Sequence, residues 1–189
     1  VQWLRDSLKI IKTSQDVENL ASSVQSSEGV YLIPSFVGLG APHWNQSAQG
    51  TIFGLTRGST DAHIARAALE SIAFQTMDVL KAMESDSGTT INQLRVDGGA
   101  TVNDMLMQFQ SDVLNKITIR PKVIETTAMG AAFLAGLAVD FWKNTNEIQK
   151  IWQRETSFTP TKSRKKIKKK IKGWYKAIKA LEYWTKIKT

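Results

Sequence analysis

The chain has 189 residues, 42% of them hydrophobic, and a formal net charge of +8, which suits one globular domain or a domain with an appendage. It contains no cysteine, which excludes disulfides and thiol catalysis and fits the reducing cytoplasm, where we expect the protein to reside. No apolar run approaches the ~18 residues of a membrane span, and the first residues show no signal peptide.

The positive charge is concentrated at the end of the chain. Residues 161–189 hold 12 basic residues and one acid, a net +11, whereas residues 1–160 hold 13 basic and 16 acidic residues, a net −3. We therefore expect a main lobe over residues 1–160 and a basic terminal segment over residues 161–189. The first five residues read like the interior of a helix and include no initiator Met, which suggests a lobe taken from a longer protein.

The first third of the chain predicts two short helices and two strands. Apolar spacing indicates helices over residues 1–12 and 17–24, and short apolar runs indicate strands over residues 30–34 and 51–55. The loop between these strands is rich in glycine, but Pro42 interrupts it and a strand follows, so it is not a dinucleotide-binding loop.

A long helix is predicted over residues 62–83, with Thr60 or Asp61 as its cap. Its many small residues imply close packing against a sheet. The positions expected on its inner face are Ile64, Ala67, Ala68, Ile72, Val79 and Met83.

A strand, a tight turn and a helix are predicted around two consecutive glycines, Gly98 and Gly99. Residues 94–96 alternate as a strand, and the helix is indicated by the spacing of Val102, Met105, Leu106, Phe109 and Val113. Backbone amides at such a helix start have no partner within the helix and can bind an anion such as a phosphate. Paired glycines also let a ligand approach the backbone closely.

The second half predicts alternating strands and helices, which is typical of an α/β fold with a mixed sheet. A strand over residues 117–121 precedes a core helix over residues 128–142, capped by Thr126 or Thr127, and residues 154–164 read as a linker. The last segment is an amphipathic helix whose apolar stripe comprises Ile167, Ile171, Trp174, Ile178, Leu181 and Trp184. Its lysines can bind an anionic surface or a nucleic acid, but the regular stripe favours a helix packed on the lobe with solvated lysines.

The sequence assembles no catalytic set. His43 and His63 lack the partners and spacing of a zinc site. Asp97 fits a turn residue that caps the Gly-Gly bend better than a general base. Asn103 lies one helical turn after Gly99, so its amide faces either a bound base or ribose, or solvent.

Several segments together resemble the carbohydrate-kinase family. Residues 50–55, His63-Ile64 and residues 67–70 fit a signature of that family, and residues 94–103 and 126–142 add to the likeness. Residues 34–44 and 54–58 resemble the family's glycerol kinases more closely than its xylulose and gluconate kinases. The resemblance covers nearly the whole chain.

The resemblance implies the C-terminal lobe of an actin-like ATPase, with a ribonuclease H-like fold of mixed sheet and flanking helices plus a terminal amphipathic helix. It implies that Gly99 and Ala100 lie near the α-phosphate of ATP or ADP, that Asn103 contacts the adenosine, and that Gln2 belongs to the same nucleotide site. It places glycerol, most Mg²⁺ contacts and the catalytic base in an N-terminal lobe, so no catalytic residue is expected here.

The function implied is ATP-dependent phosphorylation of glycerol to sn-glycerol 3-phosphate by a parent enzyme, with this chain inactive alone. A homo-oligomeric parent is expected, without nucleic acid and without a membrane span. Two alternatives stay open: another carbohydrate kinase of the same family, and a non-catalytic ATP-binding or assembly module whose basic tail meets an anionic partner.

Overall fold

The computed structural model describes residues 1–187. In chain order the elements are α1 (Gln2–Asp6), α2 (Asp16–Ser22), β1 (Tyr31–Ile33), β2 (Thr51–Phe53), α3 (Asp61–Ser87), β3 (Gln93–Arg95), the 3-10 helix η1 (Gly99–Val102), α4 (Asp104–Leu114), β4 (Ile117–Pro121), α5 (Thr126–Ala138), α6 (Thr145–Ile151), β5 (Arg154–Phe158) and α7 (Arg164–Lys186). Among these described residues, no helix combines the length and apolar character needed to cross a membrane.

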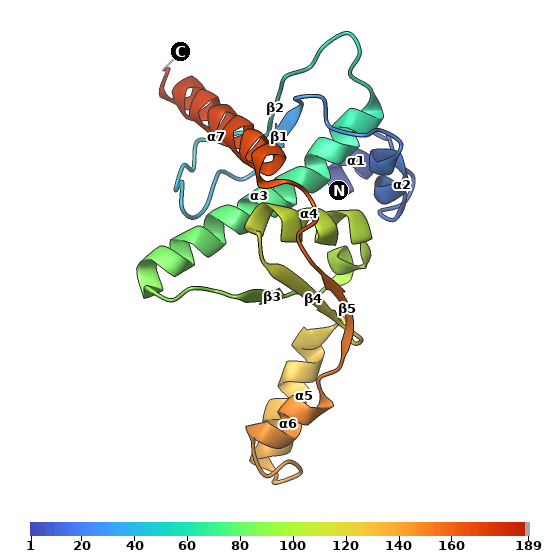
Figure 1. The fold of residues 1–189 in the computed structure, drawn as a ribbon, viewed down its shortest axis with the longest axis vertical. Coiled ribbons are helices and arrows are strands. Elements are labelled where there is room, and N and C mark those ends of the chain that lie inside the picture. Colours follow the sequence, from blue (N-terminus) through green and yellow to red (C-terminus); the bar gives the residue numbers. More distant parts are fainter. Residues whose placement is uncertain (188–189) are drawn as a thin grey trace.

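The long helix α3 runs through the middle of the molecule, between two small sheets (Figure 1). On one side β1 and β2 form an antiparallel pair, with Leu32 opposite Ile52, and α7 packs against β1. On the other side β4 pairs in parallel with β3 and antiparallel with β5, in the order β3-β4-β5. The fold is therefore mixed α/β, as the alternation of elements predicted.

Helix α3 starts where the sequence predicted. Thr60 is its N-cap, and the Thr60 backbone amide donates to Nδ1 of His63 at 3.1 Å, one half of a capping box. Small residues then allow close packing, and the helix ends at Gly88, which adopts φ +65. Val79 and Met83 are exposed, so their expected place on the inner face is wrong. Val79 lies on the outer side of the helix, between buried Asp78 and Leu80, whereas Met83 lies in the last turns, which extend beyond the core (Figure 1).

The core between α3, α4 and α7 is built around aromatic rings. Phe74 of α3 stacks on Trp174 of α7 with ring centroids 5.2 Å apart, and it meets Phe109 of α4 edge-on at 5.5 Å. All three side chains are buried, and such pairs stabilise a core beyond the area that they bury. Residues from three distant parts of the sequence thus form one core.

A buried carboxylate on α3 holds the terminal helix. Asp78 is 3% exposed and accepts hydrogen bonds from Nε1 of Trp174 at 2.8 Å and from the hydroxyl of Tyr175 at 2.7 Å. Nε2 of His43, from the loop between β1 and β2, lies 3.2 Å from the same carboxylate. One side chain therefore joins α3, α7 and this loop.

Two further buried carboxylates hold the start of the terminal segment. Nζ of Lys170 donates to both oxygens of Glu70 at 2.6 and 2.7 Å, and Ser27 donates to Glu70 at 3.1 Å. Asp112 of α4 accepts from the backbone amide of Thr161 at 2.7 Å, and Nζ of Lys162 lies 3.7 Å from its second oxygen. These contacts fix where α7 begins and how it is rotated about its axis.

The apolar stripe of α7 faces the lobe. Ile167, Trp174, Ile178 and Leu181 are buried, whereas Trp184 is 68% exposed. The expectation for Trp184 is wrong because it lies in the last turn of the helix, past the end of the core. The division into residues 1–160 and 161–189 stays a proposal.

Helix α5 differs from the expected core helix. It begins at Thr126 with Glu125 at the N-cap and no side-chain cap, and it ends at Ala138 instead of residue 142. Its apolar side chains are largely exposed, with Leu134 at 71%, and Val139, directly after its end, is 75% exposed. The reason is its position: α5 and α6 project together from the end of the three-stranded sheet, away from the main core (Figure 1).

Residues 154–158 form strand β5, so the expected linker is wrong over this part. β5 pairs with the free edge of β4, with Phe158 opposite Thr118, and Phe158 is buried. An unpaired strand edge offers backbone hydrogen bonds to any adjacent extended segment. Pairing with β4 therefore makes residues 154–158 a strand, although their polar sequence by itself favours a loop.

Replacing Asp78 with alanine should destabilise the fold by roughly 2–4 kcal/mol, because the indole N–H of Trp174 and the hydroxyl of Tyr175 would lose their buried acceptor. Chemical denaturation measures the change. Asp86→Ala, at an exposed position of the same helix, is the control and should change stability little. Equal stabilities of the two variants would show that Asp78 does not hold α7.

The stability of the fold should fall at high pH because of Tyr175. Burial raises the pKa of its phenol, and the adjacent Asp78 carboxylate raises it further. The unfolded chain therefore releases this proton from pH about 10 upward while the folded chain retains it, so the contribution is complete below that pH and is lost as pH rises. Denaturation between pH 8 and 11 should show a shallower decline for Tyr175→Phe, whereas the exposed control Tyr183→Phe should keep the wild-type slope.

Candidate functional site

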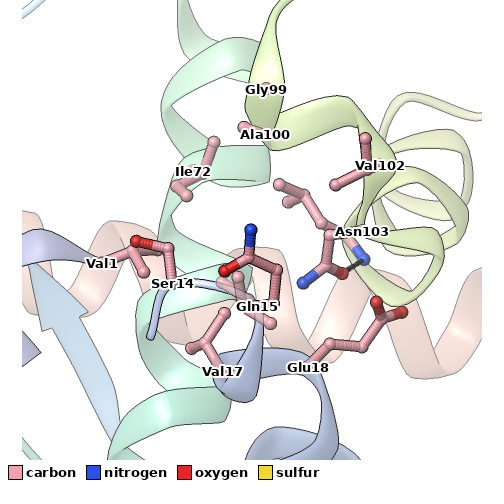
Figure 2. A pocket seen from close by; sticks show the side chains of 12 residues that line it. Val1, Ser14, Gln15, Val17, Glu18, Ile72, Gly99, Ala100, Val102 and Asn103 are labelled. Atoms are coloured by element: carbon pink, nitrogen blue, oxygen red, sulfur yellow. Dashed lines mark hydrogen bonds between the residues drawn. The ribbon is translucent and has the colours of Figure 1, made fainter. Parts of the chain in front are cut away.

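A cavity of about 560 Å³ lies between the start of α2, one face of α3 and the turn that leads into α4 (Figure 2). One part of its wall is apolar and comprises Val17, Leu69, Ile72, Val102 and Leu106. The polar part comprises Ser14, Gln15, Glu18, Gly99, Ala100 and Asn103. An apolar wall with a few polar groups is the ordinary composition of a small-molecule site.

The turn at residues 97–101 borders this cavity through Gly99 and Ala100. Gly98 adopts φ +86, and its amide donates to the carbonyl of Ile124 at 2.7 Å, while the amide of Thr101 donates to the carbonyl of Gly98 at 3.0 Å. Within residues 1–187, no acceptor is recorded for the amides of Gly99 and Ala100. A Cβ added at Gly99 would meet nothing within 4 Å, so this backbone is open to a ligand.

The helix that the sequence predicted after the glycines is divided in two. The 3-10 helix η1 begins at Gly99 and precedes α4, and the amides of the second and third residues of α4 already have acceptors. The amide of Leu106 donates to Oδ1 of Asn103 at 2.7 Å, and the amide of Met105 donates to Oε1 of Glu18 at 2.8 Å. The amides of Gly99 and Ala100, which the sequence singled out, therefore lie at the start of η1, and their contact with a phosphate stays a prediction.

Asn103 is the N-cap of α4 and is 8% exposed, so it is not one turn inside the helix as the sequence suggested. Because Oδ1 accepts the capping hydrogen bond, the side-chain Nδ2 group is left for other partners. Asn103 borders the cavity together with the turn residues (Figure 2). The capping bond holds this amide in a fixed orientation.

The structure separates two other predicted residues from the cavity wall. Gln2 is exposed at the first position of α1, and the residue of that segment that lines the cavity is Val1. No side-chain hydrogen bond caps η1, and the Asp97 carboxylate accepts a hydrogen bond from the hydroxyl of Thr126 instead. That bond ties the turn to the start of α5.

Arg120 of β4 supports the turn from within the protein. Its guanidinium donates to the carbonyl of Thr101 at 2.7 Å and to the carboxylates of Asp104 and Glu155 at 2.7 and 2.6 Å. Burial by itself lowers the pKa of Arg120, but the hydrogen bonds to the two carboxylates outweigh it and raise the pKa. The turn is therefore held by a permanent cation.

Ser14, Gln15 and Glu18 of the cavity wall were not anticipated from the sequence. They lie about 85 residues before the Gly-Gly turn, and no local pattern connects the two segments. Figure 2 shows the Gln15 side chain extending between α2 and Asn103. Only the packing of α2 against α3 and α4 brings these groups together.

The described residues form no evident metal site. Across residues 1–187, no group of three or more His, Cys, Asp or Glu side chains is arranged to hold a metal ion. His63 caps α3 and His43 contacts Asp78, so both histidines have structural partners. The wall of the cavity combines apolar side chains with the backbone of Gly99 and Ala100 and with the polar side chains of Ser14, Gln15, Glu18 and Asn103.

Comparisons with known proteins identify the family to which this chain is similar. The sequence model of the FGGY family of carbohydrate kinases, C-terminal domain, matches residues 1–139. Glycerol kinases from Paraburkholderia phytofirmans and Burkholderia ambifaria are 59% and 55% identical over 184 residues, or 97% of this chain. The chain spans only 37% of the length of these relatives.

Solved structures agree. Plasmodium falciparum glycerol kinase, solved with ADP, is 35% identical with a TM-score of 0.86, over 100% of this chain and 37% of that one. Gluconate kinase from Lactobacillus acidophilus has a TM-score of 0.79 at 23% identity, over 97% of this chain and 37% of that one, and shows the fold alone. The expected actin-like α/β fold class is confirmed. The chain belongs to the FGGY family of carbohydrate kinases and corresponds to the C-terminal domain of that family.

Proposed function

We propose that this chain is the nucleotide-binding lobe of an ATP-dependent glycerol kinase, whose whole enzyme converts glycerol to sn-glycerol 3-phosphate. The observation that carries the proposal is the pairing of an apolar wall with the free amides of Gly99 and Ala100 in one cavity. A nucleotide has the matching chemistry, since its base is flat and largely apolar and its phosphates accept hydrogen bonds from backbone amides.

Each site residue then has a distinct role toward ATP or ADP. The amides of Gly99 and Ala100 donate to the phosphate nearest the ribose, and Nδ2 of Asn103 donates to the adenosine. The apolar wall receives the base. Gln2 takes part only as a neighbour of Val1, which borders the cavity from the first turn of the chain.

The chain contributes binding to the reaction and leaves the phosphoryl transfer to other groups. Transfer requires in-line placement of the acceptor hydroxyl and neutralisation of charge around the γ-phosphate. The cavity wall includes no basic side chain and no pair of carboxylates for that purpose. The donor set does not suit Mg²⁺ either, and we place that ion with the nucleotide phosphates and the remaining part of the enzyme.

Glycerol is favoured over a sugar as the substrate by similarity. The chain is 59% identical to a bacterial glycerol kinase and 35% identical to the Plasmodium enzyme, compared with 23% for gluconate kinase. Another carbohydrate kinase of the family remains the alternative enzyme. By the same similarity we place the parent enzyme in the cytoplasm and expect it to be a homo-oligomer.

The exposed apolar surface of helix α5 supports the proposal that this lobe works within a larger protein. Its sequence is apolar on every side, and such helices are normally buried. In this chain Leu134 of α5, and Val139 and Phe141 just after it, are 71–75% exposed. A non-catalytic nucleotide-binding module, the second alternative, would have to keep this surface in water or cover it with another protein.

The purified chain should bind ADP and should not phosphorylate glycerol. Titration with ADP, followed by NMR, should shift the amide resonances of Gly99 and Ala100 first, while a coupled assay for ADP release with glycerol should stay at background. An enzyme that joins this chain to the remaining portion found in the relatives should prefer glycerol to xylulose and gluconate. Glycerol phosphorylation by the 189-residue chain at the rate of a complete kinase would contradict the assignment.

Adding one methyl group at Gly99 should weaken ADP binding without unfolding the protein. The Cβ of Gly99→Ala enters open space in the free protein but occupies the approach of the phosphate. We expect roughly a tenfold loss of affinity in calorimetry, from a clash of about 1.4 kcal/mol. Gly40→Ala, which also meets nothing within 4 Å but lies outside the cavity, should bind ADP normally.

Two substitutions of Asn103 should separate its two roles. Asn103→Ala removes the cap and should cost about 1 kcal/mol of stability together with ADP affinity. Asn103→Asp keeps an N-cap acceptor but loses the Nδ2 donor, so stability should persist while ADP binding weakens. If the aspartate variant bound ADP like the wild type in calorimetry, the contact of Nδ2 with the nucleotide would be disproved.

A further inference from the structure

A continuous row of lysines runs along the solvent side of α7. Its members recur at alternating intervals of four and three residues, with one tyrosine among them: Lys165, Lys169, Lys172, Lys176, Lys179, Tyr183 and Lys186. All seven side chains are exposed. At ~1.5 Å per residue the row is about 30 Å long, and this spacing keeps it on one face of the helix.

The docking of α7 on the lobe fixes the direction in which this lysine row points. Ile167, Trp174 and Leu181 are buried on the opposite side of the helix, and Asp78 and Glu70 hold α7 at two points. Over residues 1–187, the one lysine of α7 with a carboxylate partner is Lys170, which is not in the row. The row therefore presents uncompensated charge in a fixed orientation.

If the solvent side of α7 served only to keep the helix soluble, it would not need an unbroken row of like charges. Like charges one turn apart repel each other and destabilise a helix by about 0.2–0.5 kcal/mol per pair, whereas mixed charges give solubility without that cost. The helix holds a single acid, Glu182, which lies off the row and 3.9 Å from Nδ1 of His43. An external polyanion would remove the repulsion.

The chemistry of the row fits a lipid surface better than a nucleic acid. The row contains lysines and no arginine, and arginine is the residue that forms bidentate contacts with phosphates and bases. At its C-terminal end Tyr183, Trp184 and Ile187 are 54–70% exposed, and aromatic side chains favour the headgroup level of a bilayer. The net −3 of residues 1–160 also orients the molecule with α7 toward a negative surface.

We propose that the lysine row of α7 is a peripheral binding face for bilayers that contain anionic lipids. The lysines meet the headgroup phosphates, and Tyr183, which belongs to the row, lies at the level of the headgroups. Nothing in the helix crosses the bilayer, because its apolar stripe stays buried on the lobe. This inference stands apart from nucleotide binding, and its test contains no nucleotide.

Vesicle sedimentation of the complete chain tests the proposal. Vesicles of phosphatidylcholine with 30 mol% phosphatidylglycerol should bind the protein at low salt and release it as salt rises, because screening weakens the attraction. Pure phosphatidylcholine vesicles measure any adsorption through the exposed apolar surface of α5. The quadruple variant Lys169→Gln, Lys172→Gln, Lys176→Gln, Lys179→Gln should lose binding by roughly 100-fold or more.

A matched variant changes the same net charge away from the row. Lys9→Gln, Lys12→Gln, Lys143→Gln, Lys150→Gln lies on α6 and in loops, and it should bind anionic vesicles almost as tightly as the wild type. Circular dichroism and denaturation establish that both variants are folded. Equal binding to neutral and anionic vesicles, or equal losses in the two variants, would overturn the proposal, as would tighter binding to duplex DNA than to the vesicles at 150 mM salt.

Discussion

Three buried carboxylates hold the terminal segment to the rest of the molecule. Asp78 and Glu70 lie two helical turns apart on α3, and Asp112 lies on α4. Each is almost completely buried and accepts hydrogen bonds from α7 or from the segment just before it. Because an unpaired buried charge is costly, these acids require α7 to be docked and set its rotation. The placement of the Phe74–Trp174 stack and the outward direction of the lysine row both follow from that docking.

The candidate nucleotide site depends on a different set of constraints. The turn at residues 97–101 is held by the positive φ of Gly98, by the hydrogen bond that the Thr126 hydroxyl donates to Asp97 and by the guanidinium of Arg120. Within residues 1–187, the two backbone amides that follow Gly98 have no acceptor. Helix α2, from another part of the chain, forms one side of the cavity. The carboxylate of its Glu18 accepts a hydrogen bond from the backbone amide of Met105. The contact with Glu18 therefore takes up one amide at the start of α4, and the amides of Gly99 and Ala100 stay the proposed contacts of a phosphate.

The two ends of the molecule bear surfaces of opposite character. At one end α5 and α6 expose apolar side chains, and at the other α7 exposes lysines (Figure 1). An apolar surface needs a protein cover, whereas a lysine surface needs only counter-charge. In the proposed enzyme the first would be covered by the rest of the kinase, and the second would remain free to meet a bilayer.

The sequence by itself determined the long helix from Thr60, the β1–β2 hairpin, the strand at residues 117–121 and the turn around Gly98, because each rests on local periodicity, capping or turn chemistry. The tertiary structure alone decided that β5 is a strand and that α5 is exposed. The cavity wall is the clearest case, since Gln15 and Glu18 reach Asn103 across about 85 residues of sequence. Contacts between distant segments decide burial and hydrogen-bond partners, and no local pattern encodes which segments will meet.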